Sequence, residues 1–434
     1  MGMYFGTDGI RGKYGTDITP SLAFKCGCSL SNLCKIKKVL IGRDTRVSGD
    51  VLALSVANGL MSHGVSVIDV GITPTPVISF LTTLLKCDFG VVISASHNPP
   101  EHNGIKIFDK NGYKISEKDE EKIESFFSFS EYCTFDKLGK YQFKPNYINK
   151  YKDFVLKNSL KLDGLKIVID CGYGATFKLA KEIFSSLNAN ITFLNCKNKG
   201  LKINENCGAL YPEYIANEVI KQKADIGFSF DGDGDRIIAC DEKGNIIDGD
   251  DILYILSKNL DKKEKFIVGT SMTNKGLEDI LEKNKINLLR ADVGDKYVAE
   301  IMKSKNALLG GEPSGHIIIR NFSKTGDAIW AACTLSMIAK KLNKPISKII
   351  DYKKYPQINK NIVVNDKFRI LNSKVLSQTI IDIQKIFKNK GRILVRASGT
   401  ENKIRIMCEH ISKKTALETA LKLEKIVLQA NKSY

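Results

Sequence analysis

The sequence feature that most constrains the fold is a repeated alternation of short apolar segments with helical segments. The first series consists of apolar strands at 39–41, 65–70 and 89–93, with helices at 47–61 and after the turn at 73–76. The same cadence restarts with strands at 165–170 and 266–271. Strands separated by helices predict mainly parallel sheets covered by helices. We therefore expect an α/β fold with three successive α/β domains built on mixed sheets.

The C-terminal part of the chain departs from this alternation. A stretch at 341–356 contains Lys and Pro residues and is typical of a linker, and two strands at 393–396 and 404–408 then precede an amphipathic helix at 415–429. This order predicts a smaller α+β fourth domain. The expected domains are 1–150, 151–250, 251–350 and 351–434. A cleft between such domains suits a small substrate, and each domain would contribute one loop to it.

Composition limits the class of protein. A chain of 434 residues with 43% apolar residues is long enough for several buried cores. No apolar run reaches the ~20 residues of a membrane span, and residues 1–7 lack the features of a signal peptide, so we expect a cytoplasmic protein without a membrane partner. The eleven Cys residues are scattered, which favours reduced thiols. Cys26 and Cys28 lie in an apolar helical run and are expected to pack in a core.

Basic residues are abundant, and the formal net charge is +18. They are mostly Lys, spread along the chain without a nucleic-acid-binding motif, so we expect no nucleic-acid partner. Only ten residues are Arg, and six of these lie in or beside motifs rich in Gly, Ser, Asp or Thr. Arg binds phosphate and carboxylate through a planar fork that Lys lacks. The first candidates for ligand contacts are therefore Arg11, Arg43, Arg46, Arg236, Arg396 and Arg405.

Three carboxylates at alternate positions form the most concentrated charge in the chain. Asp231, Asp233 and Asp235 are separated by glycines and lie between the apolar runs 226–230 and 237–240. Such a cluster repels itself unless a cation is present. Hard oxygen ligands on a compact loop suit Mg²⁺ better than Zn²⁺. The loop therefore predicts a magnesium site for phosphate chemistry.

Two other interpretations of this loop are possible. In an EF-hand, the three Asp residues would occupy positions one, three and five, and Glu242 position twelve. Position six, however, is Arg236 rather than the Gly that the turn needs, and the flanks resemble strands. The other alternative is a solvated acidic turn, since Asp and Gly both favour turns.

A second polar loop follows the apolar strand that ends at residue 93. It contains Ser94, Ser96 and His97 and is followed by Asn98 and two prolines. Ser96 would be exposed there as a nucleophile that accepts and returns a phosphoryl group. Lys106 would serve in proton transfer or phosphate binding. The alternative is an ordinary capped turn.

The chain also contains two Arg-bearing loops near its N-terminus. Arg11 lies between glycines in the segment 6–12, where it has little reason to pack, and we expect a functional role for it. Arg43 and Arg46 lie just after a strand. For Arg43, a structural salt bridge with Asp44 or another carboxylate is the alternative to ligand binding.

Two further loops carry groups that bind sugars and phosphates. The segment 310–316 brings together Glu312, Ser314 and His316, a set suited to sugar hydroxyls. The segment 396–401 offers a guanidinium, hydroxyls and backbone N–H groups, which suit a phosphate that takes no part in the reaction. Its candidate phosphate ligands are Arg396, Ser398, Gly399 and Thr400, with Arg405 adding charge.

With these four loops in this order, the chain resembles the α-D-phosphohexomutase superfamily over its whole length. The resemblance rests on Ser-Ala-Ser-His-Asn-Pro at 94–99, Asp-Gly-Asp-Gly-Asp-Arg at 231–236, Gly-Glu-Pro-Ser-Gly-His at 311–316 and Arg-Ala-Ser-Gly-Thr-Glu at 396–401. The opening segment 5–12 and Lys-Thr-Gly-Asp at 324–327 are most similar to the bacterial branch that acts on glucosamine phosphates.

The resemblance implies an isomerase that interconverts glucosamine 6-phosphate and glucosamine 1-phosphate for UDP-N-acetylglucosamine and cell-wall synthesis. Phosphoserine at Ser96 would donate to the sugar, and the resulting 1,6-bisphosphate would turn over and return its other phosphate. The implied metal ligands of Mg²⁺ are Ser96, Asp231, Asp233 and Asp235. The implied catalytic residues are Ser96, Arg11, His97, Lys106 and His316. The implied substrate contacts are Arg236, Glu312, Ser314, Arg396, Ser398, Gly399, Thr400 and Arg405.

Several alternatives remain within this expectation. Asn402 replaces a Pro that is common after Gly-Thr-Glu in the superfamily, and Pro313 occupies a position that varies with substrate. Mutase activity on glucose or mannose phosphates is therefore the enzymatic alternative. An idle phosphosugar- or polyanion-binding relative is the non-enzymatic one. Either a kinase or a bisphosphate activator would first phosphorylate Ser96, and the activator would be glucose 1,6-bisphosphate or glucosamine 1,6-bisphosphate. The protein would be a monomer or a homodimer.

Overall fold

A computed structural model of the chain describes residues 4–6, 8–128, 132–261, 263–398 and 401–432. Contacts between residues divide the chain into two compact units. The first comprises Met1–Thr270 and Leu289–Ile350, and the second comprises Ser271–Leu288 and Asp351–Tyr434. Among the described residues, no helix combines the length and the apolar character that crossing a bilayer requires.

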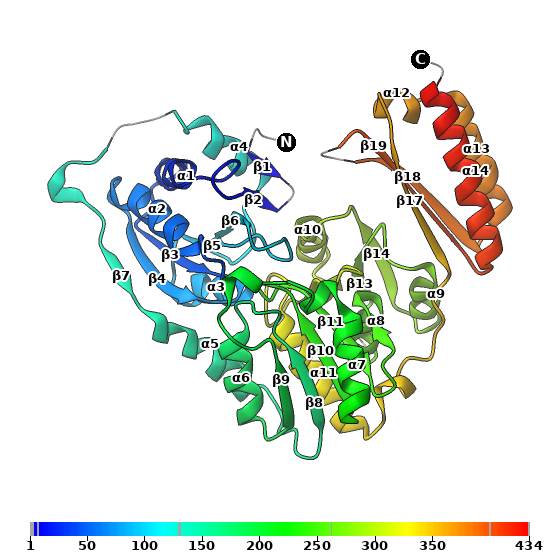
Figure 1. The fold of residues 1–434 in the computed structure, drawn as a ribbon, viewed down its shortest axis with the longest axis horizontal. Helices are drawn as coiled ribbons and strands as arrows, with labels where there is room; N and C mark the ends of the chain where they lie inside the picture. The colour runs from blue at the N-terminus through cyan, green and yellow to red at the C-terminus, as the bar shows by residue number, and fades with distance from the viewer. Residues whose placement is uncertain (1–3, 7, 129–131, 262, 399–400, 433–434) are drawn as a thin grey trace. The chain divides into compact units, whose positions relative to one another are not determined.

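The first unit begins with a seven-stranded sheet in the order β1-β2-β6-β5-β3-β4-β7. Its strands are β1 (Phe5–Gly6), β2 (Gly9–Lys13), β3 (Lys38–Arg43), β4 (Ser66–Ile72), β5 (Phe89–Ile93), β6 (His102–Asp109) and β7 (Tyr141–Phe143) (Figure 1). Strands β5, β3, β4 and β7 pair in parallel, as the alternation predicts. Strands β6, β2 and β1 extend the sheet by antiparallel pairs, so the sheet is mixed, as expected.

Helices cover both faces of this sheet. Helices α1 (Pro20–Leu33) and α2 (Gly49–Met61) bury apolar side chains in one core with Ile41 of β3. Gly42 follows Ile41 and therefore faces the other side, where it lies against Ile78 of α3 (Thr75–Leu84). Cys26 and Cys28 are buried in α1, which confirms their assignment as packing residues. A fourth helix, α4 (Glu117–Ser125), follows β6.

The second sheet has the order β12-β11-β10-β8-β9. Its strands are β8 (Lys166–Asp170), β9 (Asn190–Leu194), β10 (Ile226–Phe230), β11 (Ile237–Asp241) and β12 (Ile246–Ile247), and its helices are α5 (Asn149–Lys157), α6 (Phe177–Ser186) and α7 (Pro212–Gln222). Strands β9, β8 and β10 are parallel, whereas β10 and β11 form an antiparallel pair. All residues of β10 and β11 are buried, so the connection between them is held on a rigid base.

The third sheet has the order β14-β13-β15-β16. Its strands are β13 (Phe266–Thr270), β14 (Asn287–Ala291), β15 (Leu309–Gly311) and β16 (Ile317–Ile319). The helices of this part of the chain are α8 (Gly249–Ser257), α9 (Lys275–Lys283), α10 (Asp295–Lys305) and α11 (Ala328–Leu342), of which α9 belongs to the second unit. The short antiparallel pair β15–β16 holds the loop 312–316 between its ends.

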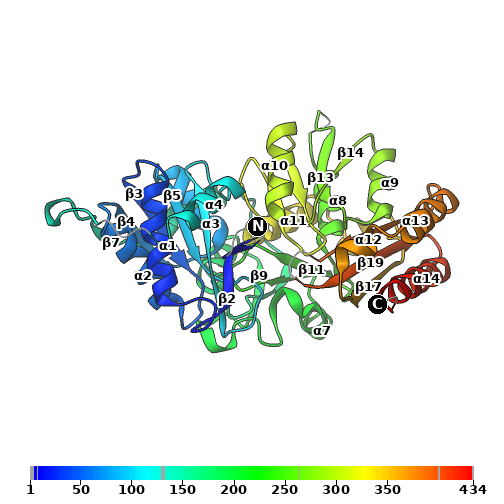
Figure 2. The same ribbon diagram turned by 90° about the horizontal axis from the view of Figure 1, so that it is seen from above.

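The second unit contains a three-stranded antiparallel sheet in the order β17-β19-β18. Its elements are β17 (Gln357–Val363), α12 (Lys367–Leu371), α13 (Lys374–Phe387), β18 (Gly391–Ala397), β19 (Lys403–His410) and α14 (Lys413–Lys432). Helices α13 and α14 lie side by side along this sheet in both views (Figure 1 and Figure 2). Two strands and the last helix were predicted. Strand β17 and helices α12 and α13 were not. The predicted linker 341–356 is only partly irregular, because α11 extends to Leu342 and a 3-10 helix spans Ile346–Lys348, whereas 351–356 contains no helix or strand.

Five short 3-10 helices complete the part of the chain that the structure describes. They are η1 (Phe135–Lys137), η2 (Pro145–Ile148), η3 (Gly200–Lys202), η4 (Gly208–Leu210) and η5 (Ile346–Lys348).

Candidate active site

The serine loop begins where β5 ends, and a chain of hydrogen bonds fixes its shape. Ser96 is fully buried, so the expectation that it would be exposed is wrong. Its φ is +52°, a left-handed conformation that costs energy for a residue with a side chain. Its N–H donates to Ser94 Oγ (2.8 Å), and Ser94 Oγ donates to Asp44 Oδ2 (2.5 Å). The surrounding bonds therefore maintain the backbone that presents Ser96.

Arg46 holds the same loop through hydrogen bonds from its guanidinium group. Its Nε donates to Asp44 Oδ2 (2.9 Å), and its Nη2 donates to the carbonyl oxygens of Ser96 (3.0 Å) and Asn98 (2.7 Å). Its Nη1 donates to the carbonyl oxygen of His102 (2.9 Å). The side chain is buried, and it donates to the Asp44 carboxylate and to backbone carbonyl oxygens. Arg46 therefore positions the serine loop and is not the ligand contact that the sequence suggested.

Arg43 also serves the fold. It forms ion pairs with Asp50 and with Asp69, the second at 3.4 Å. Arg43 therefore forms a structural salt bridge, which was the alternative to ligand binding. Its partners are Asp50 and Asp69 and do not include Asp44.

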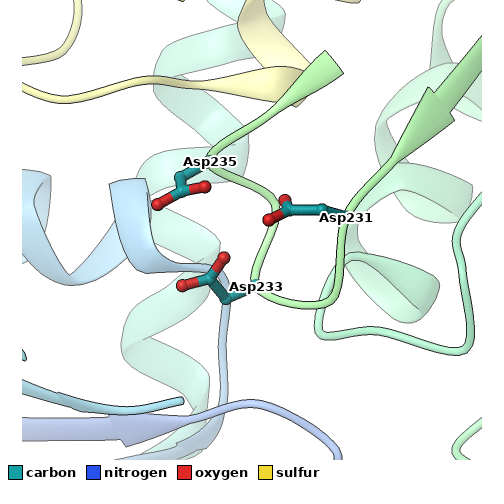
Figure 3. A group of neighbouring side chains, drawn as sticks. All are labelled: Asp231, Asp233 and Asp235. Atoms are coloured by element: carbon teal, nitrogen blue, oxygen red, sulfur yellow. The ribbon is translucent and has the colours of Figure 1, made fainter. Parts of the chain in front are cut away.

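The three carboxylates of the β10–β11 connection lie together. Figure 3 shows Asp231 and Asp235 at the two ends of the loop and Asp233 at its turn, with the three carboxylates facing a common space. Each offers an oxygen within 4.8 Å of the others, and all three are buried. Ser96 Oγ donates to Asp231 Oδ2 at 2.5 Å. Ser96 and the acidic loop, distant in the sequence, thus lie together.

The setting of the loop excludes an EF-hand. Strands rather than helices flank it, because β10 and β11 pair in register from Phe230–Ile237 to Ile226–Asp241. Glu242 accepts hydrogen bonds from Ser347 instead of turning toward the three carboxylates. A solvated acidic turn is equally excluded, because the carboxylates are buried.

The donor set of the loop fits a divalent cation. Asp233 Oδ1 and Asp235 Oδ1 are buried oxygens without a hydrogen-bond partner among the described residues. Burial, together with Asp235 and Asp233, raises the pKa of Asp231 well above its usual range. A hard cation would satisfy the unpartnered oxygens and favour the ionised form of all three carboxylates.

Lys106 of β6 supplies a cation to the same cluster. Its Nζ donates to Asp233 Oδ2 (2.8 Å) and Asp235 Oδ2 (2.9 Å), and its side chain is 1% exposed. Burial acts to raise the pKa of Asp235, but Lys106 and His316 outweigh it and hold this pKa well below its usual range. Thr75 Oγ1 donates to Asp233 Oδ2 (2.6 Å) and fixes this carboxylate further.

Arg11 of β2 reaches the site beside Asp8. Its guanidinium forms an ion pair with Asp8 and donates weakly to the carbonyl oxygen of Ala95 (3.4 Å). Its buried Nε has no hydrogen-bond partner among the described residues. Burial acts to lower the pKa of Arg11, but Asp8, Asp233 and Asp235 raise it, so Arg11 stays charged. The predicted functional arginine is therefore held close to the serine loop with donor capacity left over.

The pKa values of the two histidines shift in opposite directions. Burial, followed by Arg236 and Arg11, lowers the pKa of His97 to about 4, so this ring, whose Nδ1 lies 3.4 Å from Ser96 Oγ, is neutral near pH 7. For His316, burial acts to lower the pKa, but Asp295 and Asp235 raise it.

The ring nitrogens of His316 have distinct roles. Its Nε2 accepts from the N–H of Gly326 (2.8 Å), although Asp295 Oδ2 lies 3.3 Å from the same atom. A backbone N–H cannot rotate away, so we assign Nε2 as the acceptor. The ring proton then resides on Nδ1, 3.9 Å from Asp235 Oδ2.

The sugar loop places one buried carboxylate close to these groups. Glu312 Oε1 accepts from the N–H of Gly294 (3.1 Å), and burial raises the pKa of Glu312. Ser314 is exposed, and its Oγ lies 3.5 Å from Glu312 Oε2. Arg236 pairs through its backbone with His316, and its buried Nε has no hydrogen-bond partner among the described residues. The loop therefore combines an acceptor, a hydroxyl and a guanidinium, which suits a polyhydroxylated ligand.

The segment 396–401, for which a phosphate site is expected, belongs to the second unit. Arg396 and Arg405 are direct cross-strand partners of β18 and β19 and so share a face of the sheet. Like charges directly opposite each other are destabilising. Glu401 Oε2, 3.7 Å from Arg405 Nη2, offsets part of this repulsion, and a bound anion would offset more. Arg405 Nη2 lies 3.4 Å from Ser398 Oγ. Gly399 and Thr400 lie outside the described residues. The carbonyl of Asn402 accepts from the N–H of Val364 (2.9 Å), so Asn402 has a backbone role beside the loop.

Sequence reasoning missed a group of charged residues around this site. Lys114 forms ion pairs with both Asp8 and Asp295, and Asp295 faces His316. Lys114 is one of many lysines, and Asp295 lies in no motif that we recognised. Only Asp8, in the glycine-rich opening segment, carried a sequence signal. Their roles arise from folding, which brings distant elements together.

Comparison with known proteins places these features in a family. Four family models, described as phosphoglucomutase/phosphomannomutase domains, match the chain in order. The α/β/α domains I, II and III match residues 2–131, 145–244 and 248–355, and the C-terminal domain matches residues 360–426.

Full-length relatives share about two fifths of their residues with this chain. A phosphoglucosamine mutase from Finegoldia magna is 40% identical over 442 residues, covering 98% of this chain and 98% of that protein. The phosphoglucosamine mutase of Bacillus subtilis is also 40% identical and covers 98% of each chain. That of Geobacillus thermodenitrificans is 42% identical and covers 94% of each.

Solved structures share the fold. A phosphoglucomutase/phosphomannomutase family protein from Burkholderia thailandensis superposes with a TM-score of 0.83 at 24% identity and covers 98% of this chain and 97% of that one. An N-acetylphosphoglucosamine mutase from Aspergillus fumigatus, solved with GlcNAc-6P and magnesium, gives a TM-score of 0.71 at 17% identity and covers 99% and 96%. The four matched domains and the full-length relatives show that this chain belongs to the phosphoglucosamine mutase family of the α-D-phosphohexomutase superfamily.

Proposed function

We propose that this chain interconverts glucosamine 6-phosphate and glucosamine 1-phosphate through a phosphoserine at Ser96. The observation that carries the proposal is the 2.5 Å hydrogen bond from Ser96 Oγ to Asp231, within a buried group of three carboxylates. Relatives named phosphoglucosamine mutase over nearly the whole chain favour glucosamine phosphates over glucose or mannose phosphates.

The reaction requires one serine to serve both ends of the sugar. Phosphoserine at Ser96 transfers its phosphoryl group to the free hydroxyl of the monophosphate, so the P–Oγ bond breaks and a 1,6-bisphosphate forms. After the bisphosphate turns around, Ser96 Oγ attacks the other phosphate and releases the isomeric product. Asp231 already accepts the hydroxyl proton of Ser96 in a hydrogen bond, which orients the oxygen for attack.

Charged side chains around Ser96 stabilise the transferred group in this proposal. Arg11 and Lys106 provide positive charge, while His97 and His316 are the candidates for proton transfer to and from the sugar hydroxyls. The ring of His97 is neutral near pH 7 and so has a nitrogen that can accept a proton, and His316 carries its ring proton on Nδ1, from which it can be donated.

Asp231, Asp233 and Asp235 would hold Mg²⁺ together with the phosphoserine. When bound, the ion neutralises charge on the transferred phosphoryl group. The unpartnered oxygens of Asp233 and Asp235 support this assignment, and the fungal relative solved with magnesium agrees with it.

The remaining contacts would orient the substrate. Arg236, Glu312 and Ser314 would bind the sugar. The phosphate that takes no part in the transfer would be held by Arg396, Ser398, Gly399, Thr400 and Arg405. The division of these tasks among domains at 1–150, 151–250, 251–350 and 351–434 is part of the same proposal.

The proposal also covers the first phosphorylation of Ser96 and the cellular compartment in which the enzyme acts. Glucose 1,6-bisphosphate or glucosamine 1,6-bisphosphate would phosphorylate Ser96 initially, and a serine variant of the Aspergillus enzyme has been solved with glucose 1,6-bisphosphate. The enzyme would act in the cytoplasm on a small phosphosugar, as a monomer or homodimer, in the supply of UDP-N-acetylglucosamine. Its eleven free thiols agree with a reducing compartment.

A comparison of substrates tests this proposal. Mutase rates are measured with Mg²⁺ and glucose 1,6-bisphosphate on the 6-phosphates of glucosamine, glucose and mannose. A kcat/KM highest for glucosamine 6-phosphate supports the proposal. Preference for glucose or mannose 6-phosphate moves the activity to another branch of the superfamily, and activity on none of the three overturns it.

A further inference from the structure

Two cysteines lie at the ends of neighbouring parallel strands in the second sheet. Cys171 follows β8 and Cys196 lies two residues after β9, and the two strands pair up to Asp170–Leu194. Beyond that pair, the N–H of Cys171 donates to the carbonyl oxygen of Leu194 (3.1 Å). Continued by one residue, this register places Cys171 opposite Asn195, so Cys196 is a diagonal neighbour of Cys171. With strands ~4.8 Å apart and a rise of ~3.3 Å per residue, diagonal neighbours are ~6 Å apart, within the ~4.4–6.8 Å Cα separation that a disulfide requires.

The two thiols interact directly. The Cys171 thiol donates a hydrogen bond to the Cys196 sulfur, and Cys196 Sγ lies 2.7 Å from the carbonyl oxygen of Phe177, to which its own thiol donates. Cys171 is fully buried, whereas Cys196 is only partly buried. A reagent from solvent would therefore meet Cys196 first, with a second sulfur already in contact behind it.

The surroundings make the two sulfurs unequal in acidity. The hydrogen bond from Cys171 lowers the pKa of Cys196, and Lys181 lowers it further against the effect of burial. The same hydrogen bond, followed by burial, raises the pKa of Cys171 well above its usual range. Cys196 is thus the more acidic of the two thiols, and on ionising it gives up its donation to the carbonyl oxygen of Phe177.

The stretch after Cys171 supports the metal-binding loop. The N–H of Ala175 donates to the carbonyl oxygen of Gly232 (2.8 Å), and Gly232 lies between Asp231 and Asp233. Gly174 packs so closely that an added Cβ would lie 2.5 Å from the same oxygen. The N–H of Gly174 donates to the carbonyl oxygen of Cys171 (2.8 Å), which ties the cysteine to this support.

We propose that Cys171 and Cys196 form a redox modification site that acts on the neighbouring metal loop. A peroxide is the oxidant: the Cys196 thiolate attacks one oxygen, forms a sulfenic acid and releases the other oxygen as water after protonation. The Cys171 thiol, losing its proton, then displaces hydroxide from the sulfenic acid, giving the disulfide and a second water. Two thiols and one hydrogen peroxide thus become one disulfide and two waters.

The disulfide changes the support of the metal loop. A sulfur–sulfur bond is ~2.05 Å long, so the thiols must move together from hydrogen-bond contact. The stretch from Cys171 to Ala175 shifts with them, and Gly232 loses the support that fixes its carbonyl oxygen. Reduction by a small dithiol restores the original contacts. The inference concerns metal binding and holds whichever sugar phosphate the enzyme uses.

Peptide mapping tests the chemistry. The full chain is treated with a range of hydrogen peroxide concentrations, free thiols are alkylated, and the digest is analysed by mass spectrometry. We expect a Cys171–Cys196 linked peptide, lighter by about 2 Da than the sum of the reduced peptides, in the wild type and in Cys207→Ser. Cys207 is a buried thiol of the same domain and so is the matched control. Absence of the linked peptide, or its presence at equal yield with other cysteine pairs, overturns the proposal.

Calorimetric titration with Mg²⁺ tests the consequence. We expect oxidation to raise the Mg²⁺ dissociation constant of the wild type about tenfold, an effect typical of disturbed residues behind a metal ligand, and dithiothreitol to reverse it. Cys171→Ser and Cys196→Ser should bind Mg²⁺ like the reduced wild type with or without peroxide, and Cys196→Ala repeats the test without a hydroxyl. A linked wild-type chain that binds Mg²⁺ with unchanged affinity contradicts the proposed action on the loop.

Discussion

Lys106 Nζ lies 2.8 Å from Asp233 Oδ2, in the interior of the carboxylate cluster that is proposed to bind Mg²⁺. The cluster is thus partly neutralised by a cation of the protein itself. This relationship has two consequences: Lys106 stabilises the chain without metal, and it weakens the attraction of the site for a second cation.

Replacement of Lys106 separates these two effects. In Lys106→Met we expect an Mg²⁺ affinity about tenfold higher, because a positive charge has left the site, and a metal-free free energy of unfolding lower by about 3–5 kcal/mol, because buried carboxylates lose their partner. Calorimetric titration measures the Mg²⁺ affinity, and urea unfolding with and without Mg²⁺ measures the free energy of unfolding. Asp233→Asn should lose Mg²⁺ affinity instead, and exposed Asp153→Asn should change neither quantity. Unchanged or weaker Mg²⁺ binding in Lys106→Met would contradict this view of the site.

Arg46 should contribute to stability through its fork rather than its charge alone. Arg46→Lys keeps the charge but loses most donations to the carbonyl oxygens of the serine loop. We expect the free energy of unfolding to fall by about 3 kcal/mol, whereas Arg43→Lys, which retains an ion pair with carboxylates, should lose less than about 1 kcal/mol. Urea unfolding compares the two. Equal losses would show that the fork does not hold the loop.

Asp327 should make the stability of the fold depend on pH. Burial raises the pKa of Asp327 to about 6, although the N–H of Trp330 and the Tyr151 hydroxyl act to lower it. The folded chain therefore holds a proton that the unfolded chain has released, and stability falls as pH rises from about 4 to 6. The loss is at most about 3 kcal/mol. Asp327→Asn should lack this slope in urea unfolding across that range, and an identical slope would rule out Asp327 as its source.

The second unit should affect substrate binding more than turnover. Because Arg396 and Arg405 face each other across β18 and β19, the sheet favours a bound anion. We expect Arg405→Gln to raise the KM for glucosamine 6-phosphate about tenfold with a smaller change in kcat, since Arg405 is proposed to hold a phosphate outside the reaction. Exposed Lys414→Gln is the control and should leave KM unchanged. A fall in kcat without a change in KM would place Arg405 in the chemistry instead.

Much of the fold follows from local patterns. The apolar runs that became β3, β5, β8, β10 and β13 are buried in the sheet centres, where a continuous apolar sequence is what both covered faces require. Edge elements were harder to predict: β17 has mostly polar or partly exposed residues, and α12 is only five residues long. Their structure depends on contacts with β19 and α14 that local sequence does not contain.

The candidate site divides in the same way. Ser96 and the three Asp residues were predicted because short loops concentrate unusual groups. The positions of Lys114 and Asp295 depend on how distant parts of the chain meet, and no local signal marks them. Arg46 shows the opposite error: a guanidinium in a polar motif suggested a ligand contact, but its donors satisfy backbone carbonyls that only the folded loop brings together.

The most direct test of the account follows a phosphoryl group onto Ser96. The dephosphorylated chain is incubated with Mg²⁺ and ³²P-labelled glucose 1,6-bisphosphate, mapped by mass spectrometry, and then given glucosamine 6-phosphate. The account predicts a gain of about 80 Da at Ser96, transfer of the label to glucosamine phosphates, and neither event in Ser96→Ala. Mutase activity that survives in Ser96→Ala, or a phosphoryl group that resides on another residue and is transferred from there, would contradict it.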